Sequence, residues 1–185
     1  MNPRHAIRDR SAQAWVGSQW LRRMPAVLLA LCLAGCYPDL DWREVGSKEG
    51  GFAVLLPARA EEASRPISSG ITLRMWTAKA GSSVFGAGYA DYPDAAAAHF
   101  DEIRDGLARN IAGRVIEDRS LTEGEFSVRS IRIEGSANGR GALLVHARLL
   151  ARAGRLHQLA VISEPGVLSE ADLDMFFRSF KRKDS

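Results

Sequence analysis

Cysteine is scarce in this chain: Cys32 and Cys36 are the only two among its 185 residues. Two thiols exclude a disulfide-dense small scaffold and a four-thiolate zinc site. A long apolar run is also missing, because the most apolar segment, Met24–Leu33, would make about 15 Å of helix, far short of the ~30 Å hydrocarbon core of a bilayer. The remaining composition, 46% hydrophobic and 25% charged, is that of an ordinary globular protein, and the length favours one domain.

The first 35 residues have the layout of a secretory signal peptide. Five arginines and a single aspartate precede the apolar segment Met24–Leu33, and two small residues follow it. A basic flank, a short apolar centre and small residues at the cleavage point are the features of such a peptide. The sequence therefore predicts that residues 1–35 are removed, and Cys32 would leave with them.

The end of the apolar segment reads Leu33-Ala34-Gly35-Cys36. This motif resembles the lipobox of bacterial lipoproteins, in which a leucine and two small residues precede a cysteine. The resemblance implies signal cleavage between Gly35 and Cys36 and attachment of diacylglycerol to the Cys36 sulfur. The alternative is a buried cysteine near an ordinary cleavage site. Tyr37 stands where inner-membrane lipoproteins commonly carry aspartate, which favours the outer membrane. The implied location is the cell envelope, with the protein lipid-anchored and facing the periplasm.

The net charge of the chain changes once residues 1–35 are removed. Of the 25 basic and 22 acidic residues in the full chain, that segment holds five arginines and one aspartate, so 20 and 21 remain. A balanced chain has no long-range attraction for nucleic acid or for anionic lipid. We therefore expect no nucleic-acid partner. The one basic cluster that remains, Lys181–Lys183, is expected to be a solvated C-terminus.

The mature chain is expected to have three parts. Residues 36–50 are polar and are interpreted as a lipidated tether. Residues 51–181 are interpreted as the folded domain and residues 182–185 as a tail. Without a disulfide, the stability of the domain must come from its hydrophobic core, which a domain of this size can supply.

Apolar periodicity and turn residues predict the elements of the domain. Strands are expected at Phe52–Leu56, Ile71–Lys79, Ser83–Tyr89, Arg114–Leu121, Glu125–Glu134, Gly141–Arg152 and Arg155–Ser163, and helices at Asp94–Asn110 and Ser169–Phe180. Residues 58–69 are expected to be a loop. Short turns between the last four strands require antiparallel pairing, and the last two strands are expected to be covered on both faces. A change of apolar phase predicts a bulge near Arg129-Ser130.

These elements predict an α+β domain, an antiparallel sheet of about six to seven strands with one long and one short amphipathic helix packed on it. Three segments, GGFAVLLPA at Gly50–Ala58, AGYADYPDA at Ala87–Ala95 and FFRSF at Phe176–Phe180, resemble the PsbP/DcrB-like fold family. That family includes extrinsic photosystem proteins and small bacterial envelope lipoproteins. The resemblance covers roughly Val45–Phe180 and implies the fold. The ion-binding residues of its photosynthetic members have no counterparts in this sequence.

Motifs for catalysis and cofactor binding are missing from the sequence. It has no Gly-x-Ser-x-Gly elbow, no phosphate-binding loop and no complete dinucleotide-binding loop. Of the three mature histidines, His99, His146 and His157, the last two fall on neighbouring strands. The expected turn pairs Leu150 with His157 and His146 with Val161, about 13 Å apart along the strands, which excludes a shared metal. We expect no cofactor, no metal and no catalytic residues, with the histidines at sheet edges or on solvated faces.

Arginines alternate along the neighbouring strands and predict a basic patch formed by Arg129, Arg132 and Arg148. The favoured alternative is cross-strand pairing of arginines with carboxylates such as Glu117, Glu125 and Glu134. An unpaired patch would meet an anionic headgroup or an acidic partner.

The leading functional hypothesis is a membrane-anchored envelope lipoprotein whose non-catalytic domain binds another envelope component. The alternative is a module for a small hydrophobic or anionic ligand, held in a groove between the long helix and the sheet near Gly86 and Gly88. The shared strand face of these two glycines otherwise indicates close packing. An enzyme of unknown class is the third hypothesis. The partner and the oligomeric state stay open.

Overall fold

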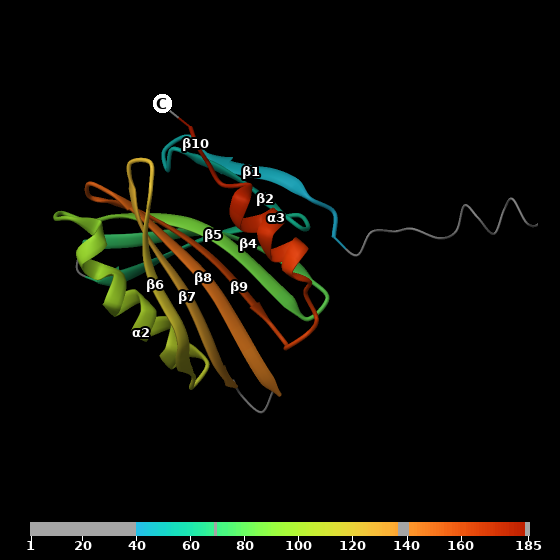
Figure 1. Cartoon of the computed structure of the whole chain (residues 1–185). Coiled ribbons are helices and arrows are strands. Elements are labelled where there is room, and N and C mark those ends of the chain that lie inside the picture. The colour runs from blue at the N-terminus through green and yellow to red at the C-terminus, as the bar shows by residue number, and fades with distance from the viewer. Residues whose placement is uncertain (1–39, 69, 137–140, 184–185) are drawn as a thin grey trace, which may run out of the picture. The chain divides into compact units, whose positions relative to one another are not determined.

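The computed structural model describes residues 40–68, 70–136 and 141–183. Most of its strands belong to one sheet, whose members in chain order are β3 (Glu61–Ser68), β4 (Ile71–Ala80), β5 (Ser83–Asp91), β6 (Arg114–Glu123), β7 (Phe126–Ser136), β8 (Ala142–Arg152) and β9 (Arg155–Ser163). Their spatial order is β3-β4-β5-β9-β8-β7-β6, and every neighbouring pair is antiparallel (Figure 1). The predicted α+β class and the predicted antiparallel sheet are confirmed.

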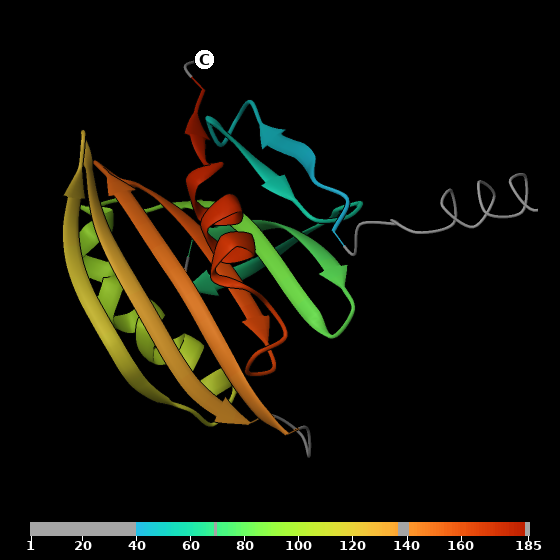
Figure 2. The same cartoon turned by 45° about the vertical axis from the view of Figure 1, so that its right-hand side comes forward.

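Each face of this sheet is covered by a different layer (Figure 2). On one face lie a 3-10 turn, η1 (Ala96–His99), and the helix α2 (Phe100–Asn110). On the other lie the helix α3 (Glu170–Arg178) and a small second sheet of β1 (Arg43–Ser47), β2 (Phe52–Leu56) and β10 (Lys181–Arg182). The hydrophobic core therefore has two parts, one on each side of the main sheet.

The predicted long helix Asp94–Asn110 is shorter in the structure. Its beginning is bound to the turn between β8 and β9, since Tyr92 N donates to Gly154 O at 2.7 Å and Ala96 N donates to Ala153 O at 2.9 Å. Ala95 offers no capping side chain, and the segment starts as the 3-10 turn η1 before α2 continues for 11 residues. The spacing of apolar residues predicts which side of a helix packs on the sheet. It does not predict which backbone N–H groups at the start of the helix form hydrogen bonds with the β8–β9 turn instead.

The predicted loop over 58–69 is wrong, because Glu61–Ser68 forms the edge strand β3. Its described side chains are exposed from Glu61 to Ile67, so the strand has no apolar alternation to detect. The predicted bulge near Arg129-Ser130 is also wrong. β7 pairs without interruption on both sides at that point, and the irregularity lies in β6, between Val115 and Glu117.

The folded part of the chain is longer than 51–181 at both ends. Arg43–Ser47, placed in the expected tether, pairs with β2 as strand β1. At the other end Lys181 and Arg182 pair with β2, and Lys183 N donates to Gly51 O at 2.9 Å. The basic cluster is therefore not a frayed tail.

Within the described ranges, no helix combines the length and the apolar character needed to cross a bilayer.

Candidate functional site

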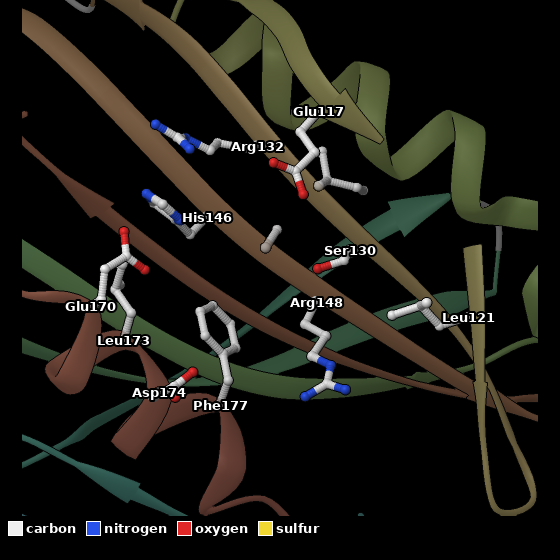
Figure 3. Close-up of a pocket in the computed structure, with 12 residues that line it drawn as sticks. Glu117, Leu121, Ser130, Arg132, His146, Arg148, Glu170, Leu173, Asp174 and Phe177 are labelled. Atoms are coloured by element: carbon white, nitrogen blue, oxygen red, sulfur yellow. The ribbon is translucent and has the colours of Figure 1, made fainter. Parts of the chain in front are cut away.

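A polar cleft of about 270 Å³ lies between α3 and the part of the sheet that neither α3 nor the small sheet covers (Figure 3). The open-face cleft, as we name it, is defined by six charged or polar side chains and one aromatic ring: Glu117 on β6, Ser130 and Arg132 on β7, His146 and Arg148 on β8, and Glu170 and Phe177 on α3. Strands β6, β7 and β8 position the first five because alternate residues of a strand point to the same face. The capping box of Ser169 and Asp172 fixes the start of α3, which carries the other two.

Arg132 is the cation of this cleft that has no carboxylate partner among the described residues. Its Nε is buried without a hydrogen-bond partner. Glu117, its cross-strand neighbour on β6, instead accepts from Arg119, with Nε and Oε1 at 3.0 Å. A buried N–H without a partner is costly, and no described carboxylate neutralises this guanidinium.

His146 lies directly across from Arg132 in the β7–β8 pairing. Burial lowers the pKa of His146, and the neighbouring Arg132 charge lowers it further. The imidazole is therefore neutral at neutral pH and leaves Arg132 as the positive charge at this point. The predicted pairing of His146 with Val161 and of Leu150 with His157 is confirmed.

Two other charges that line the cleft, Arg148 and Asp174, are already paired. Arg148 forms an ion pair with Glu123, while burial and the charge of Arg178 lower its pKa. Asp174 on α3 pairs with Arg178, with Nη2 and Oδ2 at 3.3 Å. Glu170 forms no ion pair with a described residue. The cleft thus presents one unpaired charge of each sign, Arg132 on the sheet and Glu170 on the facing helix.

The predicted basic patch is divided between the two faces of the sheet. Arg129 lies on the α2 face, where its Nη2 contacts Asp118 Oδ2 at 2.7 Å and Asp101 Oδ1 at 3.1 Å. Arg104 donates to the same Asp118 carboxylate at 3.0 Å, and hydrogen bonds from Arg129 and Arg104 lower the pKa of Asp118. Pairing of arginines with carboxylates therefore prevails at Arg129 and Arg148, through aspartates and Glu123. Two of the predicted carboxylates pair with other arginines, Glu134 with Arg114 and Glu125 with Arg152.

The other two histidines occupy different environments. His99 is bound by Asp94, with Nε2 and Oδ1 at 2.8 Å, and stacks on Tyr92. His157 is only 4% exposed, and its Nε2 lies 2.8 Å from Gly50 O. The expectation that the histidines lie on edges or solvated faces is therefore wrong for His157. Across the described ranges, no three metal-ligating side chains come together.

Gly86 and Gly88 do not border a groove. A Cβ at Gly88 would lie 2.4 Å from Met75 Sδ and 2.2 Å from Arg74 O, and one at Gly86 would lie 2.9 Å from Met75 Cε. The Met75 side chain of β4 therefore fills this part of the sheet face, and the close-packing interpretation is confirmed.

Gly35 and Cys36, the predicted cleavage and lipid sites, lie outside the described residues.

Comparisons with known proteins bear on the fold. No protein-family model and no curated protein sequence matches the chain. Among solved structures, the cyanobacterial PsbP protein CyanoP of Synechocystis sp. PCC 6803 is similar over 80% of this chain and 96% of its own, with a TM-score of 0.54 and 11% identity.

The fold is PsbP-like. A protein from Bacteroides thetaiotaomicron VPI-5482 also aligns, over 77% of this chain and 49% of its own, with 12% identity and a TM-score of 0.45. At 11% identity the similarity to CyanoP shows the fold and no residue role. The open-face cleft is therefore interpreted from this chain's own side chains. The sequence singled out Arg132, His146 and Arg148 as candidate site residues. It did not single out Glu170 or Phe177, which lie in the predicted helix Ser169–Phe180.

Proposed function

We propose that this protein is an envelope lipoprotein, anchored through lipid on Cys36, whose PsbP-like domain binds another envelope component without catalysis. The single observation that carries the anchor is the sequence Leu33-Ala34-Gly35-Cys36 at the end of a short apolar segment with a basic flank. Thioether-linked diacylglycerol with a further acyl chain gives stable membrane attachment, since each buried methylene contributes about 0.8 kcal/mol. Tyr37 after the cysteine favours the outer membrane.

Cys36→Ser is expected to abolish lipid attachment, because serine lacks the sulfur that is alkylated. Cells fed an alkyne-tagged fatty acid should label the wild-type protein, and the protein should sediment with membranes and end at residue 36 by mass spectrometry. Cys32→Ser is the matched control and should behave as wild type. An unmodified Cys36, or a mature terminus elsewhere, would contradict the anchor.

The binding surface is proposed at the open-face cleft, because Arg132 and Glu170 face each other across it without partners. A surface with one charge of each sign fits a protein partner that offers a carboxylate and a cation better than it fits an anionic membrane. Phe177 and Leu121, the latter 46% exposed, add apolar area beside the charges. Aromatic and arginine side chains are common anchors of protein interfaces.

Site-specific photo-cross-linking in cells tests this surface. A photoreactive residue at Leu121 is expected to capture a second envelope protein, and Arg132→Glu should reduce that adduct at least about threefold, since 1 kcal/mol of binding corresponds to roughly fivefold. The same residue at Asp105, on the exposed side of α2, and the substitution Arg59→Glu, at an exposed position outside the cleft, serve as controls. Equal adducts at Leu121 and Asp105, or no effect of Arg132→Glu, would refute the cleft as the interface.

A further inference from the structure

A second cavity lies on the opposite face of the sheet. Helix α2 lies behind β6, β7 and β8 in Figure 2. Residues of α2, β3, β4 and β9 line this cavity, a groove of about 280 Å³. The α2 groove, as we name it, has walls of apolar side chains: Leu73 on β4, Ile103 and Leu107 on α2, and Leu156 on β9. We propose that the α2 groove binds a small amphiphile, a molecule with an apolar body and one anionic group.

Gln158 on β9 carries the argument for a ligand. It lines the groove and is only 8% exposed, yet its carboxamide makes no hydrogen bond with any described residue. The polar atoms of this side chain are not among those that the fold seals off completely. These atoms are therefore open to the groove, where water or the polar group of a ligand can bond with them. A polar side chain kept in the middle of a central strand and directed into an apolar groove is the arrangement of a ligand-binding site.

Two arginines give the groove its preference for an anion. Arg65 on β3 and Arg109 on α2 line it, and neither forms an ion pair with a described carboxylate. The acidic lining residue is Glu102, which is engaged with His99, with Nδ1 and Oε2 at 3.6 Å. Arginine donates two parallel hydrogen bonds to a carboxylate or a phosphate. The groove therefore combines apolar walls with an excess of positive charge, which fits an amphiphile of one negative charge.

Gly106 keeps the groove open from the helix side. It lies within α2 and lines the groove, and a Cβ there would meet only Arg109 Nη2, at 3.8 Å. Glycine inside a helix costs about 1 kcal/mol relative to alanine. No close approach of other atoms requires a glycine at this position, so the space above it is the space a ligand would use. The volume lies just below the ~300 Å³ typical of drug-sized sites, which limits the ligand to a small one.

The test uses octanoate as the anionic probe and octanol as its neutral counterpart. The full chain with Cys36→Ala, free of lipid and detergent, would be titrated by calorimetry and by methyl NMR. Saturable octanoate binding is expected at one site, with shifts centred on the methyl groups of the groove walls, Leu73, Ile103, Leu107 and Leu156. Octanol is expected to bind at least about fivefold more weakly. No saturable octanoate binding, or equal binding of octanol, would overturn the proposal.

Substitutions separate the groove from non-specific binding. Gly106→Leu is expected to abolish octanoate binding, while Gly106→Ala should retain it. Arg109→Gln should weaken octanoate several-fold and leave octanol unchanged, and Arg119→Gln on β6 is the charge-matched control. Thermal unfolding followed by circular dichroism confirms that each variant is folded. Full octanoate binding by a folded Gly106→Leu variant would locate the ligand elsewhere and refute the site. None of these outcomes depends on Cys36 lipidation or on the open-face cleft.

Discussion

His157 on the central strand β9 and His99 in η1 show how neighbours set ionisation at the scale of a residue. Burial lowers the pKa of His157, which contacts the rings of Phe52, Phe126 and Phe180. A hydrogen bond with Asp94 raises the pKa of His99. An unfolded chain would give both side chains a pKa of about 6.5.

The opposite shifts predict opposite effects on stability. For His157 the folded pKa is depressed, so its contribution is complete above about pH 6.5 and is lost as pH falls through the folded pKa. For His99 the folded pKa is raised, so its contribution is complete below about pH 6.5 and is lost as pH rises through the folded pKa.

His157→Gln is therefore expected to reduce the loss of unfolding free energy between pH 7.5 and pH 5 by on the order of 1 kcal/mol. His99→Gln should instead increase that loss, by a smaller amount because the side chain is partly exposed and solvent screens its ion pair. Urea denaturation at the two pH values measures both. Identical pH dependence in wild type and His157→Gln would show that this buried imidazole is not the titrating group.

The residue scale also shows why the predicted patch could not be read from the sequence. Arg129 and Arg132 are three positions apart, so in a regular strand they point to opposite faces. The predicted bulge at Arg129-Ser130 would have brought them to one face. β7 is regular instead, and its change of apolar phase has another cause: Val128 packs on the α3 side and Ile131 on the α2 side.

At the scale of elements, burial decided most of what could be predicted, with one exception. The edge strand β6 is largely exposed, yet it was predicted at Arg114–Leu121 and ends at Glu123. The strands β2, β4, β5, β7, β8 and β9 carry apolar side chains in a strand pattern and were predicted within a few residues. The strands β1, β3 and β10 lie at the edges of their sheets, and their described side chains are largely exposed. Backbone hydrogen bonds to a neighbouring strand hold these strands in place. Such bonds do not require alternating apolar and polar residues, so the sequence shows no strand pattern there. The helix α3 was predictable because its capping box is a local signal.

The short strand β10 is expected to contribute to stability through its backbone. Ending the chain after Phe180 removes its pairing with Phe52 and Ala53 and the hydrogen bond from Lys183 N to Gly51 O. Because each such bond contributes about 0.5–1.5 kcal/mol net, we expect a loss of roughly 2 kcal/mol in urea denaturation.

Arg182→Gln is the control for β10, since it removes the ion pair with Glu125 but keeps the strand. Exposed ion pairs contribute about 0–1 kcal/mol, so this variant should lose less than half as much as the truncation. A truncated chain no less stable than Arg182→Gln would show that the strand pairing is energetically unimportant.

At the scale of the whole molecule, the sequence predicted the sheet, its antiparallel pairing and a PsbP-like fold. It did not predict either cavity. The open-face cleft brings β6, β7 and β8 to α3, and the α2 groove brings Arg65, Arg109 and Gln158 together from three distant segments. Such positions depend on where α2 and α3 cross the sheet, which side-chain periodicity does not specify. The sequence placed a groove between the long helix and the sheet, next to Gly86 and Gly88. In the structure the groove lies between α2 and the sheet, but neither glycine lines it.

The two parts of the hydrophobic core, on opposite faces of the main sheet, are built from the same strands. β5, β7, β8 and β9 each give side chains to both, for example Val128 and Ile131 of the same strand. Since the two sides share these strands, we expect them to unfold together in one cooperative transition.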